Sequence, residues 1–394
     1  MRSFHRNQFV KFKLKYSLAV LVPVVACLSA GKVTLAQSGD IDQALEAVVS
    51  VKLNGVGNES AVKAMKTLNA APSSAIPKML QAMGKTNNIS ANWIRAAVNS
   101  IVAREKKIPR DELESYFAEK KNSAVGRLLA FDLLTSGNEE LAKGMIPKLI
   151  DDPSLPLRFK AVAALIKDAE DSAESEPAKA IGSLGLAFNK ARDIKQVETI
   201  ASKLGEMGVN VDLQKQLGFL NTWQVVGAFD NKDQKGFSVA YGPEEAIGML
   251  DLAATYQDLE GKDTKWKTIA TASQTGIVDL NERVGKIKGA SVYAVGEFKA
   301  EEETDAEIRI GTPNATKIWL NGELVMENEI YHNSDSIDKF SGKVKLKKGS
   351  NQILIKVCQN EQEQSWAQGW QFQLRICDAT GKAIPPAKPP KQQY

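Results

Sequence analysis

Few side chains in this 394-residue chain could perform acid–base or metal chemistry, and their spacing matches no catalytic motif. His332 is the one histidine after residue 36. It leaves a single base for a Ser-His-Asp arrangement and excludes a metal site built from a histidine pair. The chain has no Cys-x-x-Cys, phosphate loop, Gly-x-Ser-x-Gly or dinucleotide fingerprint. These absences indicate a protein that is not an enzyme and needs no cofactor. A glycosidase mechanism stays open, because it needs only two converging carboxylates among the 47 acidic residues.

Aromatic side chains could bind a ligand instead, because an aromatic face packs against a sugar ring as well as it fills a core. Trp223, Trp319 and Trp370 lie in apolar runs, which predicts that they are core residues. Two polar loops, 327–338 and 359–369, hold aromatic side chains that are harder to bury. The predicted ligand-binding residues lie in these loops, the alternative being that the loops are only solvated. They are Asn328, Tyr331, His332 and Trp366.

These loops need a β-sheet framework to position them, and residues 218–379 supply one. The apolar runs 317–320 and 323–325 flank Asn321-Gly322, which predicts a type I′ hairpin. The runs 344–346 and 350–357 flank Gly349 and suggest a second hairpin. Apolar and polar residues alternate in several further short segments. Two antiparallel sheets in a sandwich or jelly roll are the expected solution.

Residues 37–217 show helical periodicity instead. Ile94, Ala97, Val98 and Ile101 illustrate the i, i+3, i+4, i+7 spacing that recurs in segment after segment. About ten helices are expected, each too short to be stable alone, so they must stack. Ser154 is expected to cap the helix that starts near residue 155. The fold class predicted for the whole chain is therefore multidomain, α followed by β.

The segment 151–165 (Asp-Asp-Pro-Ser-Leu-Pro-Leu-Arg-Phe-Lys-Ala-Val-Ala-Ala-Leu) resembles a HEAT repeat. That family has Asp-Pro-Ser at the turn between helices, a basic residue at the next helix start and an alanine-rich stripe after it. Helix pairs recur here about every 30–40 residues, which is typical of helical solenoids. The resemblance implies a curved scaffold that binds a protein partner. An irregular helical bundle that acts as a spacer is the alternative.

The segments 318–322 (Ile-Trp-Leu-Asn-Gly) and 346–357 (Leu-Lys-Lys-Gly-Ser-Asn-Gln-Ile-Leu-Ile-Lys-Val) look like the galactose-binding-like jelly roll. A close variant is the non-catalytic sugar-binding domain of family-two glycoside hydrolases. The resemblance implies a binding role, with a glycan as the expected partner, and it transfers no catalytic residue. The resemblance also allows for a structural calcium ion, to which the sequence assigns no ligands.

The first 36 residues have the pattern of a signal peptide. A basic segment precedes an apolar run that is too short to span a bilayer, and small residues precede the expected cleavage site after Ala36. An alternative is a bacterial lipobox that ends at Cys27, whose lipidation would attach the protein to a membrane. Either way the chain is expected to be exported, to the periplasm or the extracellular space, or lipid-anchored in the envelope.

Removing this segment also changes the charge. The whole chain carries +4, but residues 1–36 hold six of the 51 basic residues and no acid, which leaves 45 basic against 47 acidic residues. The rest of the chain has no basic excess to drive nucleic-acid binding. Cys358 and Cys377 could pair in an exported protein, but a simple hairpin would not place them opposite each other. Residues 380–394 are rich in proline and lysine and are predicted to be a disordered tail.

Together these observations predict an exported, non-catalytic binding or scaffold protein. Its helical repeats would bind a protein and its jelly roll a carbohydrate or another surface. Two alternatives are a hydrolase that acts on carbohydrate through paired carboxylates and a purely structural envelope protein.

Overall fold

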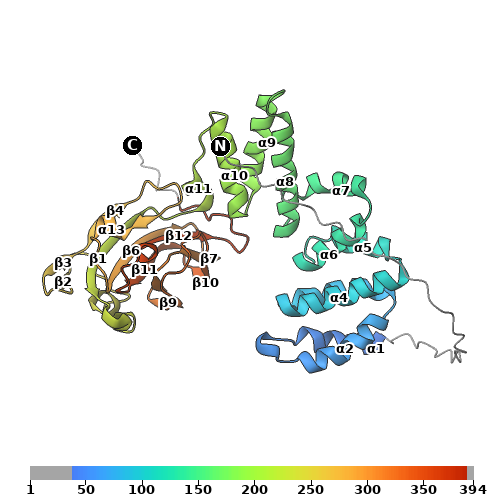
Figure 1. Cartoon of the computed structure of the whole chain (residues 1–394), viewed down its shortest axis with the longest axis horizontal. Coiled ribbons are helices and arrows are strands. Elements are labelled where there is room, and N and C mark those ends of the chain that lie inside the picture. The colour runs from blue at the N-terminus through green and yellow to red at the C-terminus, as the bar shows by residue number, and fades with distance from the viewer. Residues whose placement is uncertain (1–37, 388–394) are drawn as a thin grey trace, which may run out of the picture.

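A computed structural model describes residues 38–387, and helices are followed by antiparallel sheets as predicted. Eleven α-helices come first in the described part of the chain and form an extended stack beside the sheets (Figure 1). They are α1 (Ser38–Val49), α2 (Asn58–Ala70), α3 (Ile76–Ala82), α4 (Asn88–Glu105), α5 (Arg110–Ala118), α6 (Ala124–Thr135), α7 (Glu139–Met145), α8 (Leu155–Ser172), α9 (Pro177–Lys190), α10 (Ile194–Glu206) and α11 (Leu213–Leu217).

The apolar stripes of these helices face one another. Ile94, Ala97, Val98 and Ile101 of α4 are fully buried, in a core shared by helices α1 to α6. A second core joins α8, α9, α10 and α11. Because helices of this length are marginal in isolation, this burial is what stabilises them.

The Asp-Pro-Ser turn before α8 ties that helix to α6. Arg127 of α6 donates to both carboxylate oxygens of Asp152, at 2.5 and 2.7 Å, and both side chains are 2% exposed. Asp152 Oδ1 also accepts from the N–H of Ser154 at 2.9 Å. The Ser154 hydroxyl donates to Ala124 O at 3.2 Å and makes no cap hydrogen bond, so the predicted capping role of this side chain is wrong. The Ser154 hydroxyl instead links the start of α8 to the start of α6.

Twelve strands follow α11 in the part of the chain that the structure describes. They are β1 (Thr222–Asp230), β2 (Thr255–Gln257), β3 (Asp263–Lys265), β4 (Lys267–Ala270), β5 (Val278–Asp279), β6 (Ala290–Ala300), β7 (Thr304–Gly311), β8 (Ala315–Leu320), β9 (Glu323–Asn328), β10 (Phe340–Leu346), β11 (Gly349–Gln359) and β12 (Gln371–Cys377), with two short helices, α12 (Gly242–Glu245) and α13 (Leu280–Arg283), between them. One sheet has six strands in the order β4-β1-β6-β11-β8-β9, and a facing sheet has four in the order β10-β7-β12-β5. Strands β2 and β3 form a separate ribbon.

The first predicted hairpin is confirmed and the second is wrong. Asn321 and Gly322 both have positive φ, 52° and 97°, and connect β8 to β9. In contrast, β10 pairs with β7 in the four-stranded sheet while β11 lies between β6 and β8 in the other. Strand β11 is buried on both faces, which suits a central position, whereas the alternating lysines of β10 suit an edge. Gly349 therefore carries the chain from one sheet to the other.

The two sheets enclose the main core of the β half. Trp223 packs edge-on against Phe372 across this core, and Trp370 is fully buried in it. Trp319 is buried on the opposite face of the six-stranded sheet, in a second core with Phe229 and residues of the segment 231–266 that covers this face. All three tryptophans are therefore core residues, as predicted.

Cys358 and Cys377 are both free and buried. They lie on strands β11 and β12, which belong to different sheets. Cys358 packs with Phe237 on the outer face of the six-stranded sheet, and Cys377 approaches Glu307 O at 3.9 Å in the other sheet. A disulfide between the two is not formed.

The chain beyond β12 continues to contact the sandwich. Ala383 forms an isolated antiparallel β-bridge with Cys377, and the N–H of Ala387 donates to Lys299 O at 2.6 Å. Residues 380–387 thus lie against the β half, beyond the predicted boundary at 379, because a turn held by the Asp378 carboxylate folds them back. The predicted lipidation and cleavage residues, Cys27 and Ala36, lie outside the described residues. Within residues 38–387, no helix is long and apolar enough to cross a membrane.

Candidate functional site at the loop end of the sandwich

Polar residues gather where two strands of the six-stranded sheet end. Asn231 directly follows β1 and Asn360 directly follows β11, and these strands flank β6 on either side. The loop that follows β9 brings Tyr331 and His332 to the same end, and the loop that follows β11 brings Trp366. We call these five residues the loop-end cluster.

His332 is the centre of the cluster. Its Nε2 lies 2.7 Å from Asn360 Oδ1. Because that oxygen also accepts from the N–H of Gln362 at 3.2 Å, it acts as an acceptor, and Nε2 of His332 carries the proton. The imidazole ring stands edge-to-face with Trp366, with ring centroids 5.0 Å apart and an angle of 86° between the planes. Trp366 is thus held in place although 63% of its surface is exposed.

Tyr331 forms the half-buried side of the cluster. Asn231, which is fully buried, donates from Nδ2 to Tyr331 Oη at 3.3 Å and to Gln359 O at 3.0 Å. Burial raises the pKa of Tyr331 to about 12, although the Asn231 hydrogen bond acts in the opposite direction. The phenol is therefore protonated at neutral pH and can donate a hydrogen bond to a bound molecule.

The structure brings together three of the four predicted residues, Tyr331, His332 and Trp366. Asn328 is not part of the cluster. It ends β9 on the same side as the core residue Met326, and its buried Nδ2 has no hydrogen-bond partner among the described residues. Sequence reasoning missed Asn231 and Asn360. The available signal was an asparagine directly after each of two apolar strands.

A separate groove of about 750 Å³ opens between strands β9 and β10. These strands are the edges of the two sheets, and Gly342 lets them approach, since a Cβ there would lie 3.1 Å from Val325 O. The groove is lined by both apolar and charged side chains. The residues that line the groove are Asp305, Ala306, Glu307, Leu320, Asn321, Glu323, Val325, Lys343, Val344, Lys345 and Ala379.

A further set of titratable groups is enclosed under the segment that covers the six-stranded sheet. Lys356 is fully buried and donates to Glu244 Oε2 at 3.0 Å and to Val239 O at 2.6 Å. The Tyr293 hydroxyl donates to the same Glu244 oxygen at 2.6 Å, and burial together with this contact raises the pKa of Tyr293. Burial lowers the pKa of Lys356. These groups satisfy one another and fix the covering segment. Among the described residues, no three His, Cys, Asp or Glu side chains are grouped to hold a metal ion.

Comparison with known proteins assigns this chain to no family. No family model matches the chain, and a search of curated proteins finds no match. Among solved structures, an anti-sigma factor domain-containing protein from Clostridium clariflavum is 14% identical, over 45% of this chain and 50% of that one, with a TM-score of 0.25. A family 35 carbohydrate binding module from Clostridium thermocellum is 15% identical, over 23% and 72%, with a TM-score of 0.18. A β-glucuronidase from an uncultured Clostridium is 13% identical, over 41% and 29%, with a TM-score of 0.24.

The first of the solved structures to match, also an anti-sigma factor domain-containing protein, is covered over 46% of its length, so this chain spans about half of it. At TM-scores this low, the matches say nothing about what this chain binds.

Proposed function

We propose that this chain is an exported, non-catalytic binding protein whose β half binds a carbohydrate at the loop-end cluster. The observation that carries this proposal is Trp366, which is 63% exposed and yet fixed by His332. An exposed aromatic ring held in one orientation offers a flat apolar face on which a sugar ring can pack. His332 and Tyr331 stand beside it with polar atoms that can address hydroxyl groups.

The helical half would hold a protein partner. The starts of α6 and α8 meet through the hydrogen bond from Ser154 to Ala124 O. Each of these starts carries an exposed apolar side chain, Val125 and Leu155, and Phe159 lies one turn further along α8 with 46% of its surface exposed. Apolar side chains exposed on neighbouring helices are a common feature of protein-binding surfaces in stacked-helix proteins.

A glycan-array screen tests the proposal, using residues 37–394 with their Trp366→Ala and Phe159→Ala variants. The control is matched, because both residues are exposed aromatics and they lie in different halves. We expect binding to at least one glycan that Trp366→Ala loses and Phe159→Ala keeps. Equal binding by all three proteins would show that the loop-end cluster is not the site, and no binding by folded wild-type protein would reject the carbohydrate function.

The groove between β9 and β10 favours a second candidate function, carbohydrate hydrolysis by paired carboxylates, because Asp305, Glu307 and Glu323 all line it. Of these, Glu307 is already engaged by Arg309 at 2.7 Å, which leaves Asp305 and Glu323 as the pair to test. Release of reducing sugar by the wild type, lost in both Asp305→Asn and Glu323→Gln, would establish this function in place of the non-catalytic one.

A further inference from the structure

One loop contacts both the loop-end cluster and the helical half. Residues 329–339 connect β9 to β10. Tyr331 and His332 stand near the start of this loop and belong to the cluster. Ile337, near its end, packs against the apolar core of the last helices, together with Leu217 and Phe219. We call residues 332–338 the strap.

The strap lies against the outer face of the four-stranded sheet. Gly311 of β7 makes room for it, since a Cβ at this position would lie 2.6 Å from Ser336 O and 3.1 Å from Asp335 O. Gln373 donates from Nε2 to Asp335 O at 2.9 Å, and Gln371 donates to Asp335 Oδ2 at 2.8 Å. The backbone has positive φ at both ends of the strap, 56° at His332 and 60° at Asp338. The strap is therefore packed against β7 and β12 and hydrogen-bonded to β12.

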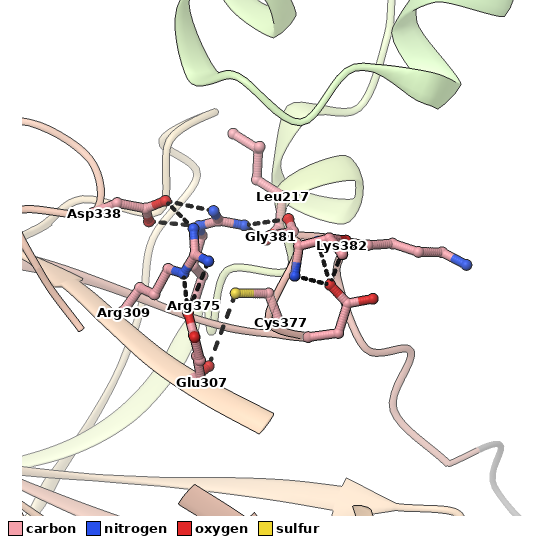
Figure 2. A network of polar contacts seen from close by, with 10 residues as sticks. Leu217, Glu307, Arg309, Asp338, Arg375, Cys377, Gly381 and Lys382 are labelled. Carbon is pink, nitrogen blue, oxygen red and sulfur yellow. Dashed lines mark hydrogen bonds and ion pairs between the residues drawn. The ribbon is translucent and has the colours of Figure 1, made fainter. Parts of the chain in front are cut away.

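A buried arginine clamps the far end of the strap to the helical half. Arg375 of β12 is fully buried and donates from Nε and Nη2 to the two carboxylate oxygens of Asp338, at 2.6 and 2.5 Å. Its Nη1 donates to Leu217 O at 3.0 Å and to Gly381 O at 2.9 Å, and Leu217 is the last residue of α11. Arg309 adds a contact to Asp338 Oδ2 at 3.0 Å. Figure 2 shows these groups converging on one point between strap, sheet and helix.

We propose that the Asp338–Arg375 clamp positions Tyr331 and His332 through the strap and thereby couples the loop-end cluster to the helical half. The inference rests on the proposed function for its meaning, because it describes how the glycan site is regulated. Since coupling between two sites is reciprocal, a protein bound to the helical half would change the affinity of the cluster for a glycan by the same factor as the glycan changes protein binding. Asp338 and Arg375 act as positioning residues and do not themselves touch the ligand.

The histidine content of the chain allows a direct test. His332 is the only histidine in residues 37–394, so labelling histidine with ¹³C at Cε1 gives one NMR signal, from the cluster itself. Asp338→Asn weakens the clamp, and Gly311→Ala pushes the strap away from β7 without touching the clamp. Glu302→Gln is the matched control, because it removes an exposed carboxylate from the turn just before β7, and Glu302 belongs neither to the strap nor to either candidate site.

We expect the His332 signal to shift by more than its line width in Asp338→Asn and in Gly311→Ala, and to stay in place in Glu302→Gln. Folding is checked by circular dichroism, and Gln371→Met, which removes a hydrogen bond from the strap at a half-buried position, replaces either variant that does not fold. An unmoved signal in folded Asp338→Asn and Gly311→Ala would overturn the coupling. The NMR measurement uses no glycan. A glycan array without binding would therefore reject the proposed function and leave the NMR result for the strap unchanged.

Discussion

The ammonium group of Lys356 lies 3.0 Å from the carboxylate of Glu244, and this contact joins the centre of the six-stranded sheet to the segment that covers it. Lys356 lies on β11, where its register partners are Tyr293 on the neighbouring strand β6 and Lys317 on the other neighbour, β8. It has no exposed surface, and only 13% of the Glu244 side chain is exposed. A charge in such a place must be fully paired, because burying it alone is far costlier than burying the pair.

We therefore expect Lys356→Met to lower the free energy of unfolding by about 3–5 kcal/mol, since it leaves the buried Glu244 carboxylate without its counter-charge. It also removes the donor to the carbonyl oxygens of Phe237 and Val239. Urea denaturation measures this loss. The control is Lys343→Met on edge strand β10, where the side chain is exposed and the expected change is within about 0.5 kcal/mol. Equal effects of the two substitutions would mean that the buried pair does not hold the covering segment.

Two adjacent carboxylates in the helical half provide a matched pair. Asp152 forms the buried bidentate contact with Arg127, whereas Asp151 pairs with Lys190 at 2.6 Å with 59% of its side chain exposed. Asp152→Asn should destabilise the chain by about 3–5 kcal/mol, because it leaves a buried guanidinium without its counter-charge. Asp151→Asn should cost no more than about 1 kcal/mol, because water screens the exposed pair. Urea denaturation of the two variants side by side tests this order.

The clamp should make stability depend on pH at the acid end. Burial raises the pKa of Asp338, but the hydrogen bonds and charges of Arg375 and Arg309 outweigh burial and hold it below the ordinary 3.8. The folded state therefore binds fewer protons than the unfolded state, and the ionised carboxylate stabilises the fold above that value. This contribution is lost as pH falls from 3.8 through the lower folded pKa.

Asp338→Asn removes this dependence. The difference in unfolding free energy between wild type and variant should be constant from about pH 5 upward and should shrink below about pH 4. Urea titrations at several pH values measure it. A difference that grew on acidification would show that the carboxylate is not held in its ionised form.

The two cysteines should be inert until the chain unfolds. Burial raises the pKa of Cys358 to about 12, and it also raises the pKa of Cys377. Since the thiolate is the reactive form, neither should react with a thiol reagent at neutral pH in the folded protein. The measurement uses residues 37–394, in which these are the two cysteines. In denaturant without reductant, both should react. Two reactive groups would confirm free thiols, and none would reveal a disulfide.

The order of helices and strands could be predicted from the sequence, because it depends on local periodicity and turn chemistry. The stripe of Ile94 and Ile101 needs only helical spacing, and Asn321-Gly322 needs only its preference for positive φ. The exposure of Trp366 could also be predicted, since a polar loop cannot bury a ring of that size.

Tertiary structure decided which strands became partners and which polar residues met. Strands β10 and β11 look like a hairpin in sequence, yet the burial of both faces of β11 placed it in the other sheet. Asn231 and Asn360 belong to the cluster because β1 and β11 end at the same end of the six-stranded sheet. A local sequence pattern cannot predict this relation between distant strands. The contact from Arg375 to Leu217 O depends on how the last helix packs on the sheet, so the connection between the two halves exists only in the folded chain.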